Sequence, residues 1–105
     1  MSKNKKLIRQ NFRDAVFARD KYACKMCGWK ENIEQLDAHH IIDRTLMPNG
    51  GYVKENGISL CPDCHKLAEI FHSTGTAHLN YSPEDLYKSI KSSEELARKE
   101  SERLK

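Results

Sequence analysis

Apolar residues recur at helical spacing near the start of the chain. Between residues 7 and 19, Ile8, Phe12, Ala15 and Val16 lie three or four positions apart, on one face of a helix. This spacing predicts an amphipathic helix over residues 7–19 whose outer face is basic. The pattern breaks at Asp20, which predicts the end of the helix there.

Two short segments further along the chain predict β-strands. Residues 36–42 end in two β-branched isoleucines, and residues 57–60 alternate in polarity. Between them, the Pro-Asn-Gly-Gly run at 48–51 predicts a turn. Residues 43–55 are therefore expected to form a long connection, a kind of segment that is usually functional.

Helical patterns return in the second half of the chain. Residues 63–72 predict a helix with an apolar face formed by Leu67, Ile70 and Phe71. The polar link that follows contains Gly75, which predicts the end of that helix.

A further helix start lies at Ser82-Pro83. A serine cap, a proline at the first helical position and acidic residues near the positive end of the helix dipole occur together there. An apolar face for docking this helix is expected from Leu86, Tyr87 and Ile90. The sequence after residue 92 is mostly charged, so we expect the last helix to fray or to project into solvent.

Composition limits the size of the core. The chain of 105 residues is 38% hydrophobic, 31% charged and 8% aromatic. A chain this short buries a limited share of its surface and is often stabilised by a metal. Two strands among several helices predict a single small domain of the α+β class.

Positive charge is concentrated at the N-terminus. Residues 1–21 carry a net charge of +5, residues 22–81 carry −2, and residues 82–105 are neutral, which gives +3 for the chain. The basic end is interpreted either as a solvated arm or as an arm that contacts phosphates. No apolar segment typical of a secretion signal or a membrane span occurs, so we expect a cytoplasmic protein without a membrane partner.

The four cysteines form two Cys-x-x-Cys pairs. Thiols stay reduced in the cytoplasm, and this spacing is typical of metal ligands. We therefore predict one structural zinc ion bound by both pairs, with Gly28 allowing the tight turn of the first. A redox pair or buried free thiols are the alternatives, but neither explains why every cysteine falls in a pair. The predicted zinc ligands are Cys24, Cys27, Cys61 and Cys64.

Histidines beside the second pair point to a different site. Neighbouring residues of a strand face opposite sides, so His39 and His40 cannot both bind one ion in a regular strand. His65 follows Cys64 immediately, and about 100° of helical rotation turns it away from the zinc. These histidines and Asn56 are therefore interpreted as a second metal site beside a free imidazole.

The order and spacing of these residues resemble those of the HNH endonuclease family. The resemblance covers residues 12–70 and rests on Arg-Asp-x-Tyr-x-Cys at 19–24, Leu-Asp-Ala-His-His-Ile-Ile at 36–42 and Asn-Gly-Ile-Ser-Leu-Cys-Pro-Asp-Cys-His at 56–65. It implies a small, zinc-stapled, treble-clef-like ββα-metal fold with an N-terminal helix and C-terminal helices. We therefore expect three parts: a basic N-terminal arm leading into the first helix (residues 1–10), the nuclease core with its zinc (residues 11–72) and a C-terminal helical extension (residues 73–105).

The resemblance also implies roles for the second site. His39 and His65 would bind the catalytic divalent ion, His40 would be the general base that activates water, and Asn56 would orient the base or help to hold the metal loop. An uncharged imidazole with a pKa near neutrality suits this base. Cleavage would hydrolyse one DNA strand per active site and leave 5′-phosphate and 3′-hydroxyl ends.

Two positions depart from the family pattern. Many relatives carry aspartate in place of His39, and two imidazoles favour Mn²⁺, Ni²⁺ or Zn²⁺ over Mg²⁺. Some relatives carry histidine where this chain has Glu69, one helical turn after His65. That carboxylate is a candidate extra ligand, the alternative being an ordinary solvated glutamate. Asp37 and His72 share faces with His39 and His65 and are interpreted as surface or supporting residues.

Double-stranded DNA is the expected partner. Arg44, Lys54 and Lys66 flank the site in sequence and are candidate phosphate contacts. No element resembles a recognition helix, so low sequence specificity is expected, from a monomer or a weak homodimer. Small chains of this kind are often phage-encoded. The alternative function is a zinc-stapled module that binds nucleic acid or protein without catalysis; His40, Asn56 and His65, which such a module does not need, favour the nuclease.

Overall fold

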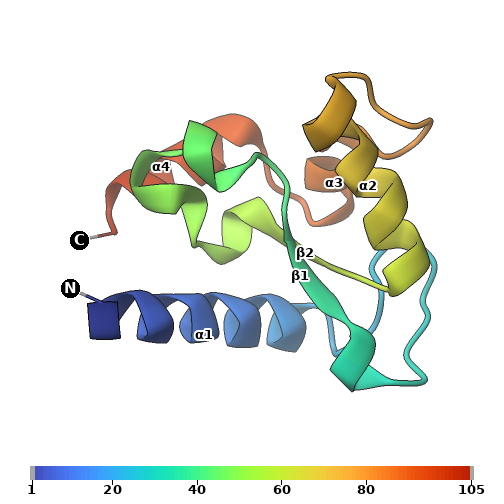
Figure 1. The fold of residues 1–105 in the computed structure, drawn as a ribbon, viewed down its shortest axis with the longest axis horizontal. Coiled ribbons are helices and arrows are strands. Elements are labelled where there is room, and N and C mark those ends of the chain that lie inside the picture. Colours follow the sequence, from blue (N-terminus) through green and yellow to red (C-terminus); the bar gives the residue numbers. More distant parts are fainter. Residues whose placement is uncertain (1, 105) are drawn as a thin grey trace.

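Figure 1 shows the fold as a computed structural model, in which residues 2–104 are described. The described chain combines α-helices with a two-stranded antiparallel sheet, so the predicted α+β class is confirmed. Helix α1 lies on one side of the hairpin, and α2 lies on the other. No helix within residues 2–104 is both long and apolar enough to cross a membrane. The main elements are α1 (Ser2–Arg19), β1 (Asp37–His40), β2 (Gly57–Leu60), α2 (Pro62–Thr74), α3 (Pro83–Ser89) and α4 (Glu94–Glu102).

Helix α1 starts earlier than the apolar pattern predicts. It begins at Ser2 because the basic segment before residue 7 contains no glycine or proline, and lysine is a good helix former. The predicted arm of residues 1–10 is thus helical from Ser2, and Met1 lies outside the described residues. Phe12, Val16 and Phe17 are buried, whereas Ala15, which the pattern placed on the core face, is exposed.

The two strands form a short antiparallel hairpin. Asp37 pairs with Leu60 and His39 with Ile58. Strand β1 ends at His40, before the predicted boundary, because a side chain takes over part of the pairing: Ile42 N–H donates to Asn56 Oδ1 at 3.1 Å. The hairpin packs closely on α1.

Residues 41–56 fold into three successive 3₁₀ turns, η2 (Arg44–Leu46), η3 (Pro48–Gly51) and η4 (Lys54–Asn56). Helix α4 packs on this connection, so the prediction that the last helix frays or projects into solvent is wrong. Ala97 and Ser101 are fully buried, and Asn49 Nδ2 donates to the carbonyls of Ser101 and Leu104 at 2.9 and 2.8 Å. The contact uses small side chains and a backbone-directed amide in place of large apolar residues.

Helix α2 ends at its predicted stop signal, and α3 begins at its predicted start signal. Cys61 caps α2, Gly75 ends it with a φ of 81°, and Ser82 forms a capping box with Asp85 at the start of α3. The buried residues of α2 are Cys64 and Ala68, whereas the predicted apolar face is only half-buried, because the helix turns its ligand-bearing side to the hairpin. The predicted face of α3 is buried as expected, at Leu86, Tyr87 and Ile90.

Candidate metal centres and active site

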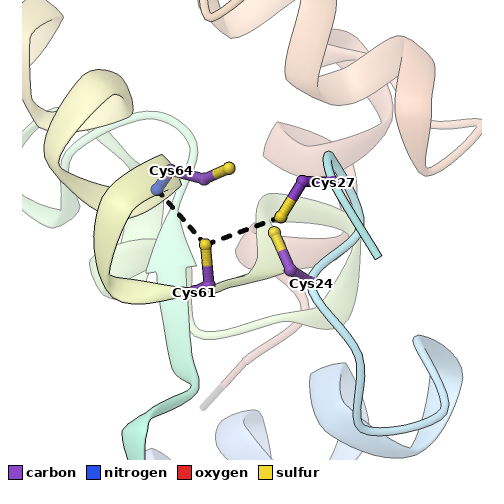
Figure 2. A group of neighbouring side chains, drawn as sticks. All are labelled: Cys24, Cys27, Cys61 and Cys64. Carbon is purple, nitrogen blue, oxygen red and sulfur yellow. Dashed lines mark hydrogen bonds between the residues drawn. The ribbon is translucent and has the colours of Figure 1, made fainter. Parts of the chain in front are cut away.

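Figure 2 shows the four cysteines pointing toward one another from two separate turns. In the first turn, Cys24 N–H donates to Trp29 O at 2.8 Å and Gly28 N–H donates to Cys24 O at 2.8 Å. Gly28 has a φ of 84°, as the predicted tight turn requires. In the second, Cys61 lies just before α2, and its sulfur accepts from Cys64 N–H at 3.4 Å.

The cluster has the dimensions of a zinc site. The four sulfur atoms all lie within 4.8 Å of one another, and Cys27 Sγ lies 3.7 Å from Cys61 Sγ. Tetrahedral Zn–S bonds of about 2.3 Å place neighbouring sulfurs about 3.8 Å apart. All four thiols are free, so the donor set fits a structural zinc ion.

The surroundings shift the pKa values of the cysteine thiols in different directions. Burial acts against the Cys24 thiolate, but backbone N–H groups of the two turns outweigh it and lower its pKa. Burial raises the pKa of the Cys64 thiol, whose sulfur lies 3.3 Å from the Tyr81 hydroxyl. A bound divalent cation would favour the thiolate at both positions. Sequence reasoning missed Tyr81, because no spacing rule connects the residue to the knuckles.

A second group of donors lies between β1 and α2. Ligand atoms of His39, His65 and Glu69 all lie within 4.8 Å of one another. Glu69 Oε2 is 3.2 Å from both His39 Nδ1 and His65 Nε2. The rings of the two histidines are 5.2 Å apart at their centres.

Strand alternation separates the two adjacent histidines. His39 is 1% exposed and faces α2, whereas His40 faces α1 and stacks on Phe12 at 4.5 Å between ring centres. The ring of Tyr52 meets His40 edge-on at 4.8 Å. The two imidazoles therefore have different neighbours although both reach the same cavity.

Both imidazoles are held uncharged. Burial lowers the pKa of His39 to about 3, helped by the neighbouring histidines, and burial lowers that of His40 to about 4. The Nε2 atoms of both rings are buried without a hydrogen-bond partner among the described residues. An uncharged ring keeps a lone pair for a metal or a proton.

These donors suit a divalent metal ion. Two imidazoles and one carboxylate line a cavity of about 270 Å³, which is open on the remaining side. Such a set leaves coordination positions free and is typical of redox-capable or Lewis-acidic transition ions. Glu69, predicted only as a candidate extra ligand, lies with the two histidines, so the group fits a catalytic metal.

Two supporting residues line the same cavity. Asp37 Oδ2 lies 3.0 Å from His65 Nε2, so Asp37 contacts His65, whereas the sequence placed it beside His39. His72 Nε2 lies 3.0 Å from the carbonyl oxygen of His40. His72 is outside the donor group, in agreement with its predicted supporting position.

Asn56 is fully buried and holds the backbone beyond His40. Its Oδ1 accepts from Ile42 N–H and, at 2.7 Å, from the Tyr87 hydroxyl. Its Nδ2 donates to the carbonyls of Ile42 and Gly51 at 3.1 and 3.3 Å. These contacts go to the connection and not to the His40 ring, so of the two predicted roles the geometry favours that of holding the loop. Nothing in the spacing of the sequence pointed to Tyr87.

The candidate phosphate contacts are not equivalent. Arg44 lines the cavity with His39 and His65, and Lys66 lines a neighbouring cavity that includes His65 and Asp37. Lys54 lines neither; its carbonyl accepts from Arg19 Nη1 at 2.6 Å. Only Arg44 and Lys66 therefore lie beside the donor group.

Comparison with protein families gave one match. Residues 24–69 match the family model described as HNH endonuclease, which confirms the resemblance seen in the sequence. The matched segment contains all four cysteines and the complete His/Glu donor group. No curated protein and no solved structure matches the chain.

Proposed function

We propose that the protein is a metal-dependent endonuclease that hydrolyses phosphodiester bonds of DNA, because residues 24–69 match the family model described as HNH endonuclease. The family match supports nuclease activity in general. The DNA substrate, the metal and the roles of individual residues belong to the proposal. The observation that carries it is the His39–His65–Glu69 donor group, which opens on the same cavity as an uncharged His40.

His39, His65 and Glu69 would hold the divalent ion. When bound, this ion would supply positive charge against the scissile phosphate and the leaving 3′ oxygen. Asp37 lies 3.0 Å from His65 Nε2, the nitrogen that also faces Glu69, so a bound ion would take the place of the proton shared there, and the buried wall around His39 fixes its rotamer. The ion would therefore meet a largely preformed set of ligands.

His40 takes the proton from the attacking water. The Nε2 atom of His40 is buried, so we assign the proton that is taken from water to Nδ1. The water oxygen then bonds to phosphorus, and the bond from phosphorus to the 3′ oxygen breaks. The 3′ oxygen takes up a proton from solvent water, which leaves a 5′-phosphate and a 3′-hydroxyl, and His40 returns its proton to solvent. The pKa of about 4 is lower than the neutral value expected from the sequence. A phosphodiester anion in the cavity would raise it, because a nearby negative charge favours the imidazolium.

His72 and Asn56 act on His40 through the backbone. His72 contacts the His40 carbonyl. Asn56 accepts from the N–H groups of Ile41 and Ile42, the two residues that follow His40. Arg44 and Lys66 lie where phosphates next to the scissile bond would pass. A module that only binds nucleic acid or protein needs the cysteine cluster, but it does not need an uncharged histidine beside a three-donor group.

A plasmid-nicking assay tests the proposal. Purified protein is incubated with supercoiled plasmid and Mn²⁺, Ni²⁺, Zn²⁺ or Mg²⁺, with and without chelator. We expect nicking that needs the ion, and loss of nicking by at least about 100-fold in His40→Ala, the usual contribution of a general base. His78→Ala, at an exposed position in the link after α2, is the matched control.

Folding must be measured beside activity. His40→Ala should keep its zinc content and its cooperative thermal transition. A folded His40→Ala protein that nicks as fast as wild type would overturn the mechanism. A wild type that binds DNA but nicks with none of the four ions would favour the binding module.

A further inference from the structure

A second groove begins at the wall of the active site. It has a volume of about 460 Å³ and runs between α1 and the connection that carries η2 and η3. Its lining includes three basic side chains and no acidic one, whereas the active-site cavity is lined by Asp37, Asp43 and Glu69. The basic residues of the groove are Lys5, Arg9 and Arg44.

The groove and the active site share a wall. Arg44 lines both cavities, and Tyr52, which lines the groove, meets the His40 ring at 4.8 Å. A chain molecule that leaves the active site past Arg44 therefore enters the groove directly. The two cavities form one path, from the donor group to the N-terminal half of α1.

The cations of the groove are exposed and unneutralised. Lys5, Arg9 and Arg44 are exposed, and within residues 2–104 none of them forms an ion pair with a carboxylate. Lys5 and Arg9 are four residues apart on one helix and repel each other at close range. By contrast, Arg98 and Arg103 pair with glutamates of their own helix. Asp43, the neighbour of Arg44, acts on its charge but lines the active-site cavity, so the groove itself holds three cations and no lining carboxylate.

Tyr52 helps to hold this arrangement. Burial acts to raise the pKa of its hydroxyl, but the guanidinium groups of Arg44 and Arg9 lie beside it and lower the pKa. Arginines from two different elements thus converge on one hydroxyl. Both arginines line the groove, and the fork geometry of a guanidinium suits phosphate oxygens.

We propose that this groove binds the sugar-phosphate backbone of the DNA on one side of the bond to be cut. The inference rests on the proposed function and extends it to Lys5 and Arg9, two residues that lie far from the His/Asn/Cys motifs in sequence. Charge complementarity and continuity with the active site favour nucleic acid over a small anion, which would need only one of the cations. The four residue steps from Lys5 to Arg9 span about 6 Å of helix, enough to separate two phosphate contacts.

Binding is measured in the His40→Ala background, so that the DNA stays intact. The fluorescence anisotropy of a labelled DNA duplex is recorded at several salt concentrations for three proteins. They are His40→Ala alone, His40→Ala combined with the groove pair Lys5→Ala and Arg9→Ala, and His40→Ala combined with the control pair Lys6→Ala and Arg13→Ala. The second pair removes the same charges from the same helix. Lys6 and Arg13 line a different groove, together with Asp14 and Glu34; Lys5 and Arg9 border that groove too, but only they also line the groove beside Arg44. All four positions are exposed, and circular dichroism checks that each variant remains folded.

The groove pair should weaken binding roughly tenfold and make the negative slope of log K against log salt shallower by about 1.8, or about 0.9 for each lost phosphate contact. The control pair should change both much less. In nicking assays with His40 restored, the groove pair should raise the DNA concentration for half-maximal rate and leave the maximal rate unchanged. Phosphates whose ethylation blocks binding should lie on one side of the cut, and Lys5→Ala with Arg9→Ala should relieve that block.

The outcomes separate this inference from the proposed function. Nicking by wild type together with equal salt slopes for the groove pair and the control pair would overturn the groove and leave the nuclease. A changed slope in a protein that never nicks would keep the groove and overturn the nuclease. Tighter binding of an RNA duplex than of a DNA duplex, or interference spread evenly on both sides of the cut, would overturn the assignment of the groove to flanking DNA.

Discussion

Replacing Asn56 tests how strongly the connection is fixed behind the active site. Asn56 is 0% exposed and makes four hydrogen bonds, two of them as acceptor from Ile42 N–H and the Tyr87 hydroxyl. In Asn56→Ala both buried donors lose their acceptor. An unsatisfied buried donor costs about 1–3 kcal/mol, so two of them at about 2 kcal/mol give a loss of about 4 kcal/mol. That is a large share of the 5–15 kcal/mol, roughly, that stabilises a typical domain.

A double-mutant cycle with Tyr87 identifies the cause of the loss. Tyr87→Phe alone removes one hydrogen bond, leaves Asn56 Oδ1 paired with Ile42 N–H, and should cost about 1 kcal/mol. In the Asn56→Ala background the same change removes an orphaned hydroxyl. The double variant should therefore be more stable than Asn56→Ala alone, by about 1–2 kcal/mol, where additivity would make it less stable.

Urea unfolding provides the measurement. Far-UV circular dichroism and the fluorescence of Trp29, the single tryptophan, are followed at one fixed excess of zinc, since bound metal adds to the apparent stability. A loss below about 1 kcal/mol for Asn56→Ala, or strict additivity with Tyr87→Phe, would refute the reasoning that this amide satisfies buried donors.

Three further predictions concern single positions, each checked by thermal or urea unfolding. Cys61→Ser should abolish the cooperative unfolding transition and lower the amount of bound zinc. Serine is a good helix cap, so the loss of stability would come from the metal and not from the start of α2. An unchanged melting temperature would contradict a structural zinc. Gly57→Ala should cost about 1–3 kcal/mol, because its Cβ would lie 2.6 Å from both Phe12 Cζ and Val16 Cγ2 in a packed core. Ala97→Glu should cost at least about 2 kcal/mol of stability, because it buries a charge where α4 meets the connection. The control Leu96→Glu, at a side chain that is 38% exposed, should change stability by less than about 0.5 kcal/mol. Equal losses would mean that α4 does not pack through Ala97.

The separation of the two metal-binding groups follows from backbone geometry that the sequence makes visible. A strand turns successive side chains to opposite faces, so His39 and His40 had to diverge, and their contacts with α2 and with Phe12 agree. One residue of helical rotation takes His65 from the sulfurs of the zinc cluster to the side of Glu69. Both rules are local, which is why they need no knowledge of the rest of the fold.

Helix α4 shows where local rules stop. Its charged sequence suggested a helix in solvent, yet it is buried at Ala97 and Ser101 and held by Asn49 from the connection. Small residues carry little apolar signal, but they allow close approach between backbones, and the partner lies about fifty residues away in sequence. The same holds for Tyr87 and Asn56, whose hydrogen bond joins α3 to the end of the hairpin. Contacts of this kind depend on the assembled fold and leave no periodic pattern.

Helix α2 links the stability of the four-cysteine cluster to the geometry of the His39–His65–Glu69 donor group. Cys61 and Cys64 lie at its first turn, and His65 and Glu69 occupy the turns that follow. A helix of 13 residues that loses its anchored start would fray from that end, because the first turn supplies the fixed point for the rest. His65 is next to the anchor and would be displaced before His72, which also contacts the carbonyl of His40. The four-cysteine cluster therefore does more than stabilise a small core: it determines where the helix begins, and with that whether His65 and Glu69 can meet His39.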